Sequence, residues 1–474
     1  MTLRLGRETL IHFASQVGVT LAGFVASFAI ARVGGAEVFG LYSVAVAVMF
    51  WLNVPATAVA NAMTKRISEG SDRSTYLGTG LLIEAGLAVG LGLGIVVASP
   101  VLDAYVTAPT GPLLGVLVAA NVALIGTLAA LQGEKRVAFS GGLKTLERVV
   151  RSVLHVTIIL LGYGVTALLA GHVVALIVAA IVGFVALNLN VGKPSATAAR
   201  SLLEFARYSW LSNLKTRAFG WMDTIVLASF AIGGSLIGVY EIAWNVASIF
   251  ALVAGSVQST LFPELSEIAV NDGYERVHHL LNEGIVFAGV FMIPGLFGAA
   301  VLGKEVLQIY GPEFTQGTTI VVVLVLARML AAYGDQFLNV ANAVDRPDVA
   351  FRVNVVFVVS NLVLNVAFVW LYGWQGAAAA TAISGAIVLV LGYRSLRALI
   401  GPPDIPWIEL LRQAVAASVM IAAVIVFEEI LPRDHYVTVL LVSVGAGIYA
   451  LALVTLSVRV RAKAVALLPD KVTY

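Results

Sequence analysis

The sequence contains no cysteine and is poor in charged residues. Without cysteine the chain can form neither a disulfide bond nor a thiolate metal site. Only 12% of its 474 residues are charged, about half of the ~25% that is typical of soluble domains. It also lacks an Asp-x-Asp carboxylate pair and a Gly-x-x-x-x-Gly-Lys-Ser/Thr phosphate loop, which argues against a metal-dependent transferase and against ATP hydrolysis. We therefore expect no enzyme activity, no catalytic residue, no metal and no cofactor.

Apolar sequence is what the chain has in excess. Hydrophobic residues make up 59% of it, and its mean hydropathy is +0.95. Fourteen apolar runs have the length of roughly 20 residues that a helix needs to cross a hydrocarbon core of about 30 Å. They lie near 11–33, 38–63, 77–98, 112–131, 148–163, 165–188, 205–231, 235–262, 281–302, 317–340, 350–372, 375–394, 409–431 and 436–457. The sequence thus predicts an all-α integral membrane protein with about 14 transmembrane helices.

The Lys and Arg residues indicate how these helices are oriented. When successive loops are assigned to alternate sides, most of the 29 Lys and Arg fall on one side, and the other side has only Arg32, Lys304 and Arg433. Because cytoplasmic loops carry the excess of Lys and Arg, we expect a multi-pass protein of the cell (plasma) membrane with both termini in the cytoplasm. Its surroundings are the lipid bilayer, and we expect no nucleic acid partner. Four cations remain inside predicted helices: Arg151, Lys215, Arg217 and Arg328.

The chain contains an internal repeat. Residues 39–69 align without gaps to 237–267, and the matched pairs include Gly40/Gly238, Tyr42/Tyr240, Ser68/Ser266 and Glu69/Glu267. The second predicted helix thus corresponds to the eighth, which indicates six helices per repeat and the same orientation for both copies, as in parallel transporter repeats. We expect an N-terminal six-helix lobe at 1–200 and a C-terminal six-helix lobe at 201–397. Two extra transmembrane helices and a cytoplasmic tail would follow at 398–474.

Several motifs resemble those of one transporter family. The segment "VNVVFVVSNLVLNVAFVWLYGWQGAAAATAISG" (353–385) has a mid-helix Asn-x-x-x-Asn, a Tyr-Gly turn, Gly-Ala-Ala and a helix of small residues with Ala-Thr. The segments "GGAEVFGLYSVA" (34–45), "WMDTIVLASF" (221–230) and "FPELSE" (262–267) fit the same pattern. With these motifs the chain resembles the polysaccharide-flippase branch of the multidrug/oligosaccharidyl-lipid/polysaccharide (MOP) exporter superfamily.

The resemblance implies two six-helix bundles that work by alternating access. The cargo of that branch is an oligosaccharide linked to polyprenyl or dolichyl phosphate, which is flipped from the cytoplasmic to the outer leaflet for surface polysaccharide or glycan assembly. A monomer is implied, with glycan polymerase or transferase machinery as candidate partners. The alternative is an ion-coupled multidrug or organic-cation antiporter of the same superfamily. That function favours a carboxylate in the first helix, and residues 11–31 contain none.

Arg328 is the first candidate for binding the headgroup. If its helix runs from 317 at the outer face to 340, Arg328 lies about 16 Å deep, which is the membrane midplane. An arginine there costs at least ~2.5 kcal/mol on insertion scales and should face a cavity or a partner. Asp335 follows two turns later on the same face. Two interpretations stay open: a cationic anchor for a phosphate, or a structural ion pair that ties this helix to a neighbour.

The predicted helix at 205–231 supplies a second group of charges. Lys215 and Arg217 lie in a polar first half, and Asp223 follows within the apolar part. Polar helix segments persist in a membrane only where they line water or are buried in protein. Lys215 and Arg217 are therefore candidate headgroup contacts, unless the helix begins near 217 and leaves Lys215 among the lipid headgroups. Asp223 and Asp335 are candidates for ion coupling or for an ion pair.

The N-terminal lobe adds two more candidates and a kink. Arg151 shares one helix face with Arg148 and could meet an entering phosphate, or the pair could serve only as cytoplasmic anchors. Glu84 is a single intramembrane acid whose partner cannot be named, and it is a third candidate for ion coupling or ion pairing. Asn53 and Pro55 predict a kink whose freed carbonyls need partners.

Overall fold

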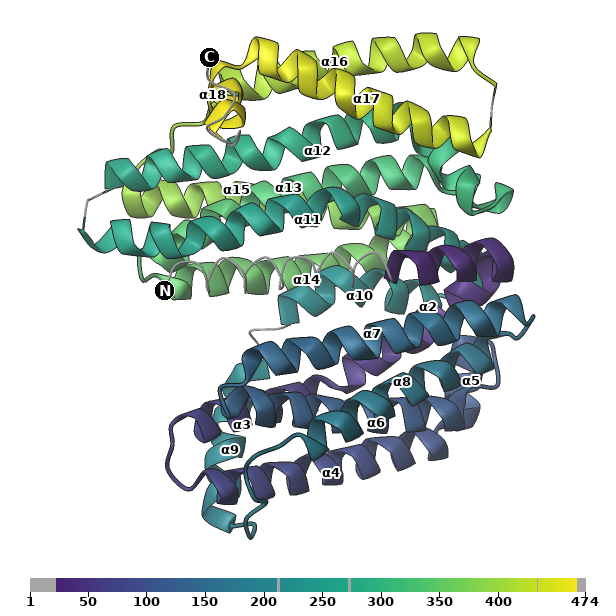
Figure 1. Cartoon of the computed structure of the whole chain (residues 1–474), viewed down its shortest axis with the longest axis vertical. Coiled ribbons are helices and arrows are strands. Elements are labelled where there is room, and N and C mark those ends of the chain that lie inside the picture. The colour runs from purple at the N-terminus through teal and green to yellow at the C-terminus, as the bar shows by residue number, and fades with distance from the viewer. Residues whose placement is uncertain (1–22, 211–213, 272–273, 433, 467–474) are drawn as a thin grey trace. The chain divides into compact units, whose positions relative to one another are not determined.

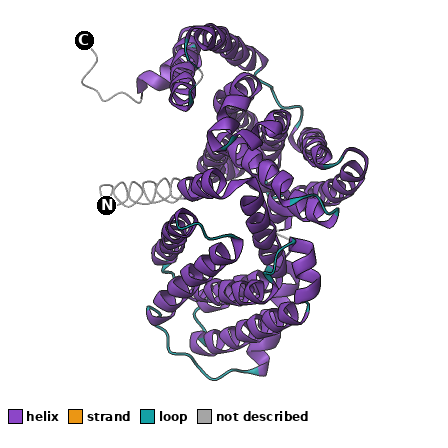
Figure 2. Cartoon of the chain, turned by 90° about the vertical axis from the view of Figure 1, so that its right-hand side faces the viewer, coloured by secondary structure: helices purple, strands orange, loops and turns teal. Residues whose placement is uncertain are grey.

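A computed structural model describes residues 23–210, 214–271, 274–432 and 434–466 of the chain. These residues form helices joined by short loops, and none of them forms a strand (Figures 1 and 2). The predicted all-α class is therefore confirmed. The start of the first predicted helix, before residue 23, lies outside the described residues.

Contacts between Cα atoms divide the chain into two compact units, Met1–Gly238 and Val239–Tyr474. In unit 1, α6 packs against α3, α4 and α8, while α7 packs on α8 and α10 on α2 (Figure 1). The helices of this unit are the π-helix η1 (Ile30–Gly34), α2 (Gly35–Leu52), α3 (Val54–Ser68), α4 (Arg73–Val97), α5 (Ser99–Val106), α6 (Gly111–Gly133), α7 (Val137–Leu160), α8 (Val165–Val185), α9 (Ala196–Ser209) and α10 (Leu214–Ser229). The lobe boundary at residue 200 stays a prediction.

Unit 2 is arranged around α13, which packs against α12, α14 and α15. α16 and α17 pack on each other and on α12 (Figure 1). Its helices are α12 (Tyr274–Tyr310), the 3-10 helix η3 (Pro312–Gly317), α13 (Thr318–Ala343), α14 (Pro347–Tyr372), α15 (Trp374–Ile400), α16 (Trp407–Ile430), α17 (His435–Leu456) and α18 (Val458–Ala466). α11 (Gly234–Asn271) begins in unit 1 and continues here.

Local sequence explains where several helices begin and end. Proline occupies the first turn of α3, α5, α6 and α14, a position where its missing N–H has no intrahelical partner to lose. Gly373 separates α14 from α15 with a φ of 64°, which glycine adopts without strain. The Tyr-Gly turn predicted here is thus a real helix boundary.

Eleven helices within the described residues are long and apolar enough to cross a membrane. The count of fourteen stays a prediction, because some of the expected spans are more charged or shorter than these eleven helices. α7 has 24 residues but carries several charged side chains. The predicted helix at 205–231 corresponds to α9, with 14 residues, and α10, with 16 residues. Lys215 and Arg217 both lie in the first turn of α10.

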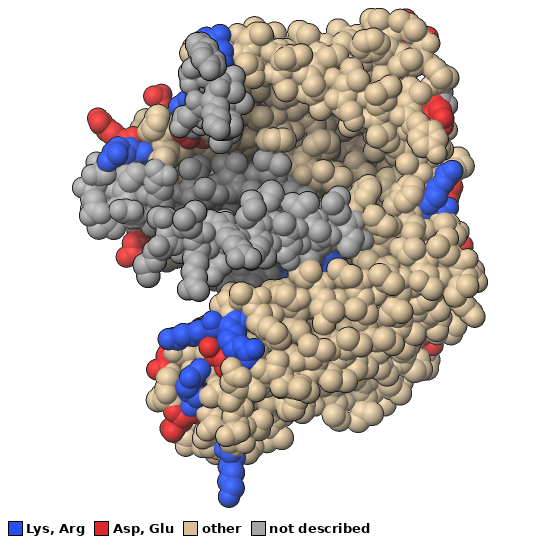
Figure 3. Space-filling model, viewed as in Figure 1, with Lys and Arg blue, Asp and Glu red and all other residues tan. Residues whose placement is uncertain are grey.

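Large apolar side chains cover the outside of these helices. Val97, Val185 and Trp370 are 83%, 78% and 72% exposed, which suits contact with lipid chains rather than with water. In the space-filling view, residues other than Lys, Arg, Asp and Glu cover most of the visible surface, and most visible charged side chains lie toward the left and right edges (Figure 3). The chain is therefore a multi-pass membrane protein.

Candidate functional site

The helix break in unit 1 is bridged by Arg217. α2 ends at Leu52 and α3 begins at Val54, with Pro55 in its first turn. Arg217 on α10 donates one Nη–H to the Phe50 carbonyl and another to Thr57 Oγ1 at 2.9 Å. The kink predicted at Pro55 is confirmed, and Arg217 supplies one of the partners that the kink requires.

The surroundings of this contact are aromatic and half-buried. The Arg217 guanidinium carbon lies 5.8 Å from the centroid of the Phe50 ring, and that ring stacks on Trp221 with the centroids 5.0 Å apart. Asn53 is fully buried beside the break, and its side-chain amide has no hydrogen-bond partner among the residues that the structure describes. A headgroup role for Arg217 stays a prediction, but its contact with the kink is structural.

Arg217→Ala should destabilise the protein by about 1.5–3 kcal/mol, which is the usual contribution of hydrogen bonds to a charged group. The variant leaves the Phe50 carbonyl and Thr57 without their cationic donor at a half-buried position. Thermal unfolding of the purified protein in detergent measures the loss. Lys144→Ala, at an exposed position on α7, is the matched loss of a cation and should have no effect. Equal melting of the two variants would contradict the structural role of Arg217.

Arg151 lies in a buried polar network that joins three helices of unit 1. Its Nε is 3.0 Å from Glu147 Oε1, one turn earlier on α7, and its Nη1 is 3.1 Å from His172 Nε2 on α8. The other ring nitrogen of His172 is 3.0 Å from the hydroxyl of Tyr42 on α2. The side chains of Arg151 and Glu147 are only 18% and 11% exposed. Because Glu147 forms an ion pair with Arg151 in these buried surroundings, it compensates much of the charge of the guanidinium. The sequence reasoning missed Glu147, although its spacing of four residues from Arg151 is the pattern of a helical ion pair.

Arg328 is held against α11 in unit 2. Its Nη2 donates to Ser248 Oγ at 2.5 Å, and its guanidinium carbon lies 4.0 Å from the centroid of the Trp244 ring. Ser248 Oγ in turn donates to the Trp244 carbonyl at 2.7 Å. A cation over the face of a tryptophan gains ~0.5–2 kcal/mol and keeps its charge. The contact therefore positions the guanidinium, which the sequence could not reveal.

The remaining candidates lie at separate places. Lys215 is half-buried in the first turn of α10, and Asp223 on the same helix is 5% exposed. Asp335 is half-buried on α13, in the same helix as Arg328 but two turns later. Glu84 on α4 is 3% exposed, and neither of its carboxylate oxygens has a hydrogen-bond partner among the described residues. Arg151 and Arg217 share no hydrogen-bond partner, so the two cations of unit 1 belong to separate sites.

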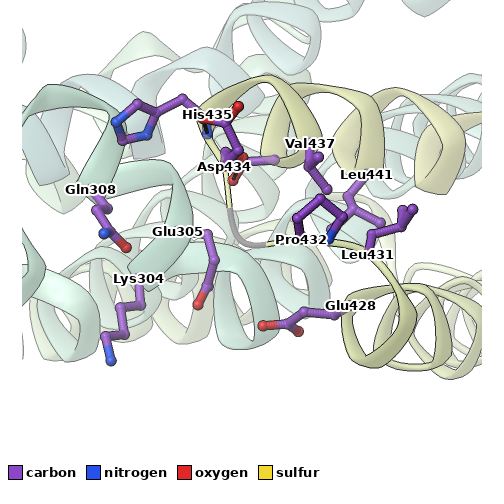
Figure 4. A pocket seen from close by; sticks show the side chains of 11 residues that line it. Lys304, Glu305, Gln308, Glu428, Leu431, Pro432, Asp434, His435, Val437 and Leu441 are labelled. Carbon is purple, nitrogen blue, oxygen red and sulfur yellow. Dashed lines mark hydrogen bonds between the residues drawn. The ribbon is translucent and has the colours of Figure 1, made fainter.

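Two pockets were not anticipated by the sequence. One, of about 190 Å³, lies between the end of α12 and the α16–α17 connection. Carboxylates of Glu305, Glu428 and Asp434 line it beside Lys304 (Figure 4). The other, of about 430 Å³, has a mostly apolar lining from α3, α4 and α9. Neither contains any of the predicted site residues.

Comparison with solved structures defines the class of the fold. Lipid II flippase MurJ in an inward closed conformation superposes with a TM-score of 0.80 at 14% identity, covering 94% of this chain and 98% of that one. A multidrug resistance transporter of the MATE family in the MOP superfamily, in an inward-facing conformation, gives a TM-score of 0.66 at 15% identity, covering 80% and 94%. At these identities the likeness concerns the fold alone, and that fold is the one of MOP-superfamily transporters.

Sequence comparison then gives the family. The family described as "Polysaccharide biosynthesis protein" matches residues 5–269. "Probable flippase AglR" of Haloferax volcanii is 31% identical over 98% of this chain and 99% of its own length. "Probable low-salt glycan biosynthesis flippase Agl15" of the same organism is 27% identical over 82% of each chain. This chain therefore belongs to the polysaccharide biosynthesis family, and the resemblance found in its motifs is confirmed.

Proposed function

We propose that this chain is a flippase that moves a lipid-linked oligosaccharide from the cytoplasmic to the outer leaflet. The observation that carries the proposal is the likeness to the probable flippase AglR over nearly the whole length of both chains. The probable glycan flippase Agl15 supports the same cargo class. These relatives are named as flippases and not as enzymes, which agrees with a function in transport.

The physical requirement of this function is a place for a phosphate inside the membrane. A phosphate headgroup loses its hydration when it leaves water, and charge-assisted hydrogen bonds from arginine can replace that hydration. Arg328 suits this role best, because it lies near the middle of α13 and because Trp244 and Ser248 orient its guanidinium. Arg151 is less suited because Glu147 already compensates its charge. Arg217 and Lys215 are secondary headgroup contacts in this proposal, and Asp223 and Asp335 are candidate ion-coupling or ion-pair sites.

The finer features belong to the same proposal. Two lobes, 1–200 and 201–397, would alternate between inward-open and outward-open states, with residues 398–474 as an addition to them. The protein would work as a monomer in the plasma membrane with both termini in the cytoplasm. Its products would be taken up by glycan polymerase or transferase machinery at the outer surface.

An ion-coupled multidrug antiporter is the alternative function. Its support is the MATE-family likeness, which at 15% identity concerns the fold alone. A cationic drug would also meet an intramembrane arginine at Arg328, and like charges repel strongly where water is scarce. The flippase proposal therefore has the better support.

Binding of cargo to the purified protein tests the proposal. A polyprenyl phosphate-linked oligosaccharide at 100 times its Kd should stabilise the protein by about 2.7 kcal/mol, since a ligand that binds only the folded state adds that amount. Thermal unfolding in detergent measures this. The same oligosaccharide without its lipid phosphate is the control and should stabilise far less. Stabilisation by an organic cation, with none by the lipid-linked glycan, would favour the antiporter instead.

A further inference from the structure

Glu84 differs from the other buried acids of the chain. It lies in the middle of α4, is 3% exposed, and has no hydrogen-bond partner for either carboxylate oxygen among the residues that the structure describes. Glu147 is buried to a similar degree but is 3.0 Å from the Arg151 Nε. Glu283 likewise has the Arg459 Nε at 2.7 Å. Among the described residues, therefore, Glu84 is a buried carboxyl group with no hydrogen-bond or ion-pair partner.

The helices around Glu84 offer little to compensate a negative charge. α4 packs against α3, α5, α6 and α9. α6 contains no titratable side chain, and a Cβ added at its Gly126 would lie 3.3 Å from Glu84 Cγ. The titratable groups of the other packed helices and of α4 itself, within the described side chains, are Lys65, Arg66, Asp103, Tyr105, Arg200, Glu204, Arg207, Arg73 and Tyr76.

The two cations of α3 have other contacts. Lys65 Nζ lies 4.6 Å from the centroid of the Phe205 ring, and Arg66 pairs with Glu69 at 3.0 Å. Asp103 on α5 accepts from the backbone amides of Thr110 and Gly111. None of these contacts extends to Glu84.

Desolvation then decides the chemical form of Glu84. An ionised carboxylate with no partner in apolar surroundings has a Born cost of tens of kcal/mol in the ideal limit, and real proteins avoid this by keeping the group neutral. A metal cation would need several oxygen ligands. Within the described part of the chain no group of three or more His, Asp or Glu side chains could hold a metal ion. A proton is the one cation that needs no further ligand.

We propose that Glu84 is a proton-binding site that couples transport to a proton gradient. The carboxyl group holds its proton in the conformation described here, where α4 and α6 enclose it. When these helices separate and admit water, the proton passes from the carboxyl oxygen to water, and the carboxylate takes up another proton before it is enclosed again. This inference rests on the proposed transport function for its purpose, but the protonated state of Glu84 can be tested without it.

Chemical labelling tests the protonated state directly. Dicyclohexylcarbodiimide is an apolar reagent that reacts with protonated carboxyl groups in apolar surroundings. In proteoliposomes containing the full chain, we expect mass spectrometry to find Glu84 labelled, with the yield falling as the pH is raised. Glu147 is the matched control, because it is also buried, with 9% exposed, but is paired with Arg151, and it should stay unlabelled. Equal labelling of the two acids, or none at Glu84 at low pH, would overturn the inference.

Transport under a pH gradient tests the coupling. One proton per cycle should shift the distribution of cargo between the leaflets about tenfold for each unit of pH difference, since one unit corresponds to 1.36 kcal/mol. Glu84→Gln, a neutral side chain of the same shape, should make that distribution independent of the gradient. A gradient response that Glu84→Gln retains would refute the coupling. If the wild type moves no cargo but Glu84 is labelled, the flippase proposal fails while the proton site stands.

Discussion

Arg328→Ala is expected to reduce headgroup translocation about 100-fold while the protein stays folded. Removing a charged hydrogen-bond donor from a phosphate costs roughly 2–3 kcal/mol, and this amount corresponds to a factor of about 30 to 150. The loss should be at the upper end, because water is scarce where α13 crosses the membrane centre. Dithionite quenching of a fluorescent lipid-linked oligosaccharide in proteoliposomes measures the rate.

Two further variants separate charge from position at Arg328. Arg328→Lys keeps the charge and the contact with Trp244 but loses the two-pronged guanidinium, so it should retain part of the activity. Ser248→Ala removes only the hydroxyl that receives Arg328 Nη2, and a moderate loss is expected if that hydroxyl positions the guanidinium. If Arg328→Ala and Arg328→Lys both lower the melting temperature in step with activity, the residue is structural, as the ion-pair interpretation of the sequence holds.

Gly40→Ala is expected to destabilise the protein by at least 1–3 kcal/mol, the usual effect of overpacking a filled interface. A Cβ at Gly40 on α2 would overlap the backbone carbonyl of Gly234, and one at Gly238 would overlap the carbonyl of Ala36. Backbone atoms cannot turn aside as a flexible side chain can. Thermal unfolding in detergent measures the effect, and Gly40→Leu should prevent folding altogether.

Gly86→Ala is the matched control for this prediction. Gly86 lies on α4, and a Cβ there would meet nothing within 4 Å. Alanine should be neutral or slightly stabilising at that position because it favours helix more than glycine does. If Gly40→Ala and Gly86→Ala melt alike, the close approach of α2 and the start of α11 does not contribute to stability.

The Gly40–Gly238 contact also bears on the internal repeat. The alignment of residues 39–69 with 237–267 pairs these two glycines. A Cβ added at either glycine would lie against the backbone of the helix that holds the other. Small residues let membrane helices approach closely, so the motif shared by the two repeats supplies both sides of one contact.

The sequence predicted the features of the molecule that depend on composition, on the length of apolar runs and on short motifs. Apolar runs of membrane length gave the all-α membrane fold, and the motifs at 353–385 gave the family. Helix boundaries near Pro55 and Gly373 followed from residues with strict backbone preferences. The bounds of α9 and α10 could not be predicted in this way, because a polar segment has no hydrophobic pattern that marks where it enters the membrane.

Contacts between residues that are far apart in the sequence could not be predicted. Arg217 and the Pro55 kink were each recognised, but residues 160 positions apart, as Thr57 and Arg217 are, leave no trace of their contact in one sequence. The same holds for Arg328 and Trp244. Glu147 could have been found, because it precedes Arg151 by one helical turn. The isolation of Glu84 could not, since it depends on what every neighbouring helix fails to supply.

The measurement that tests the account most directly is flipping of a fluorescent polyprenyl phosphate-linked oligosaccharide in proteoliposomes, with dithionite added outside. Empty liposomes should lose only the fluorescence of the outer leaflet. Liposomes with the wild-type protein should lose nearly all of it, because cargo from the inner leaflet becomes accessible. Arg328→Ala should behave like the empty liposomes. No additional quenching with the wild type, together with accumulation of an organic cation under a proton or sodium gradient, would contradict the flippase and identify an antiporter.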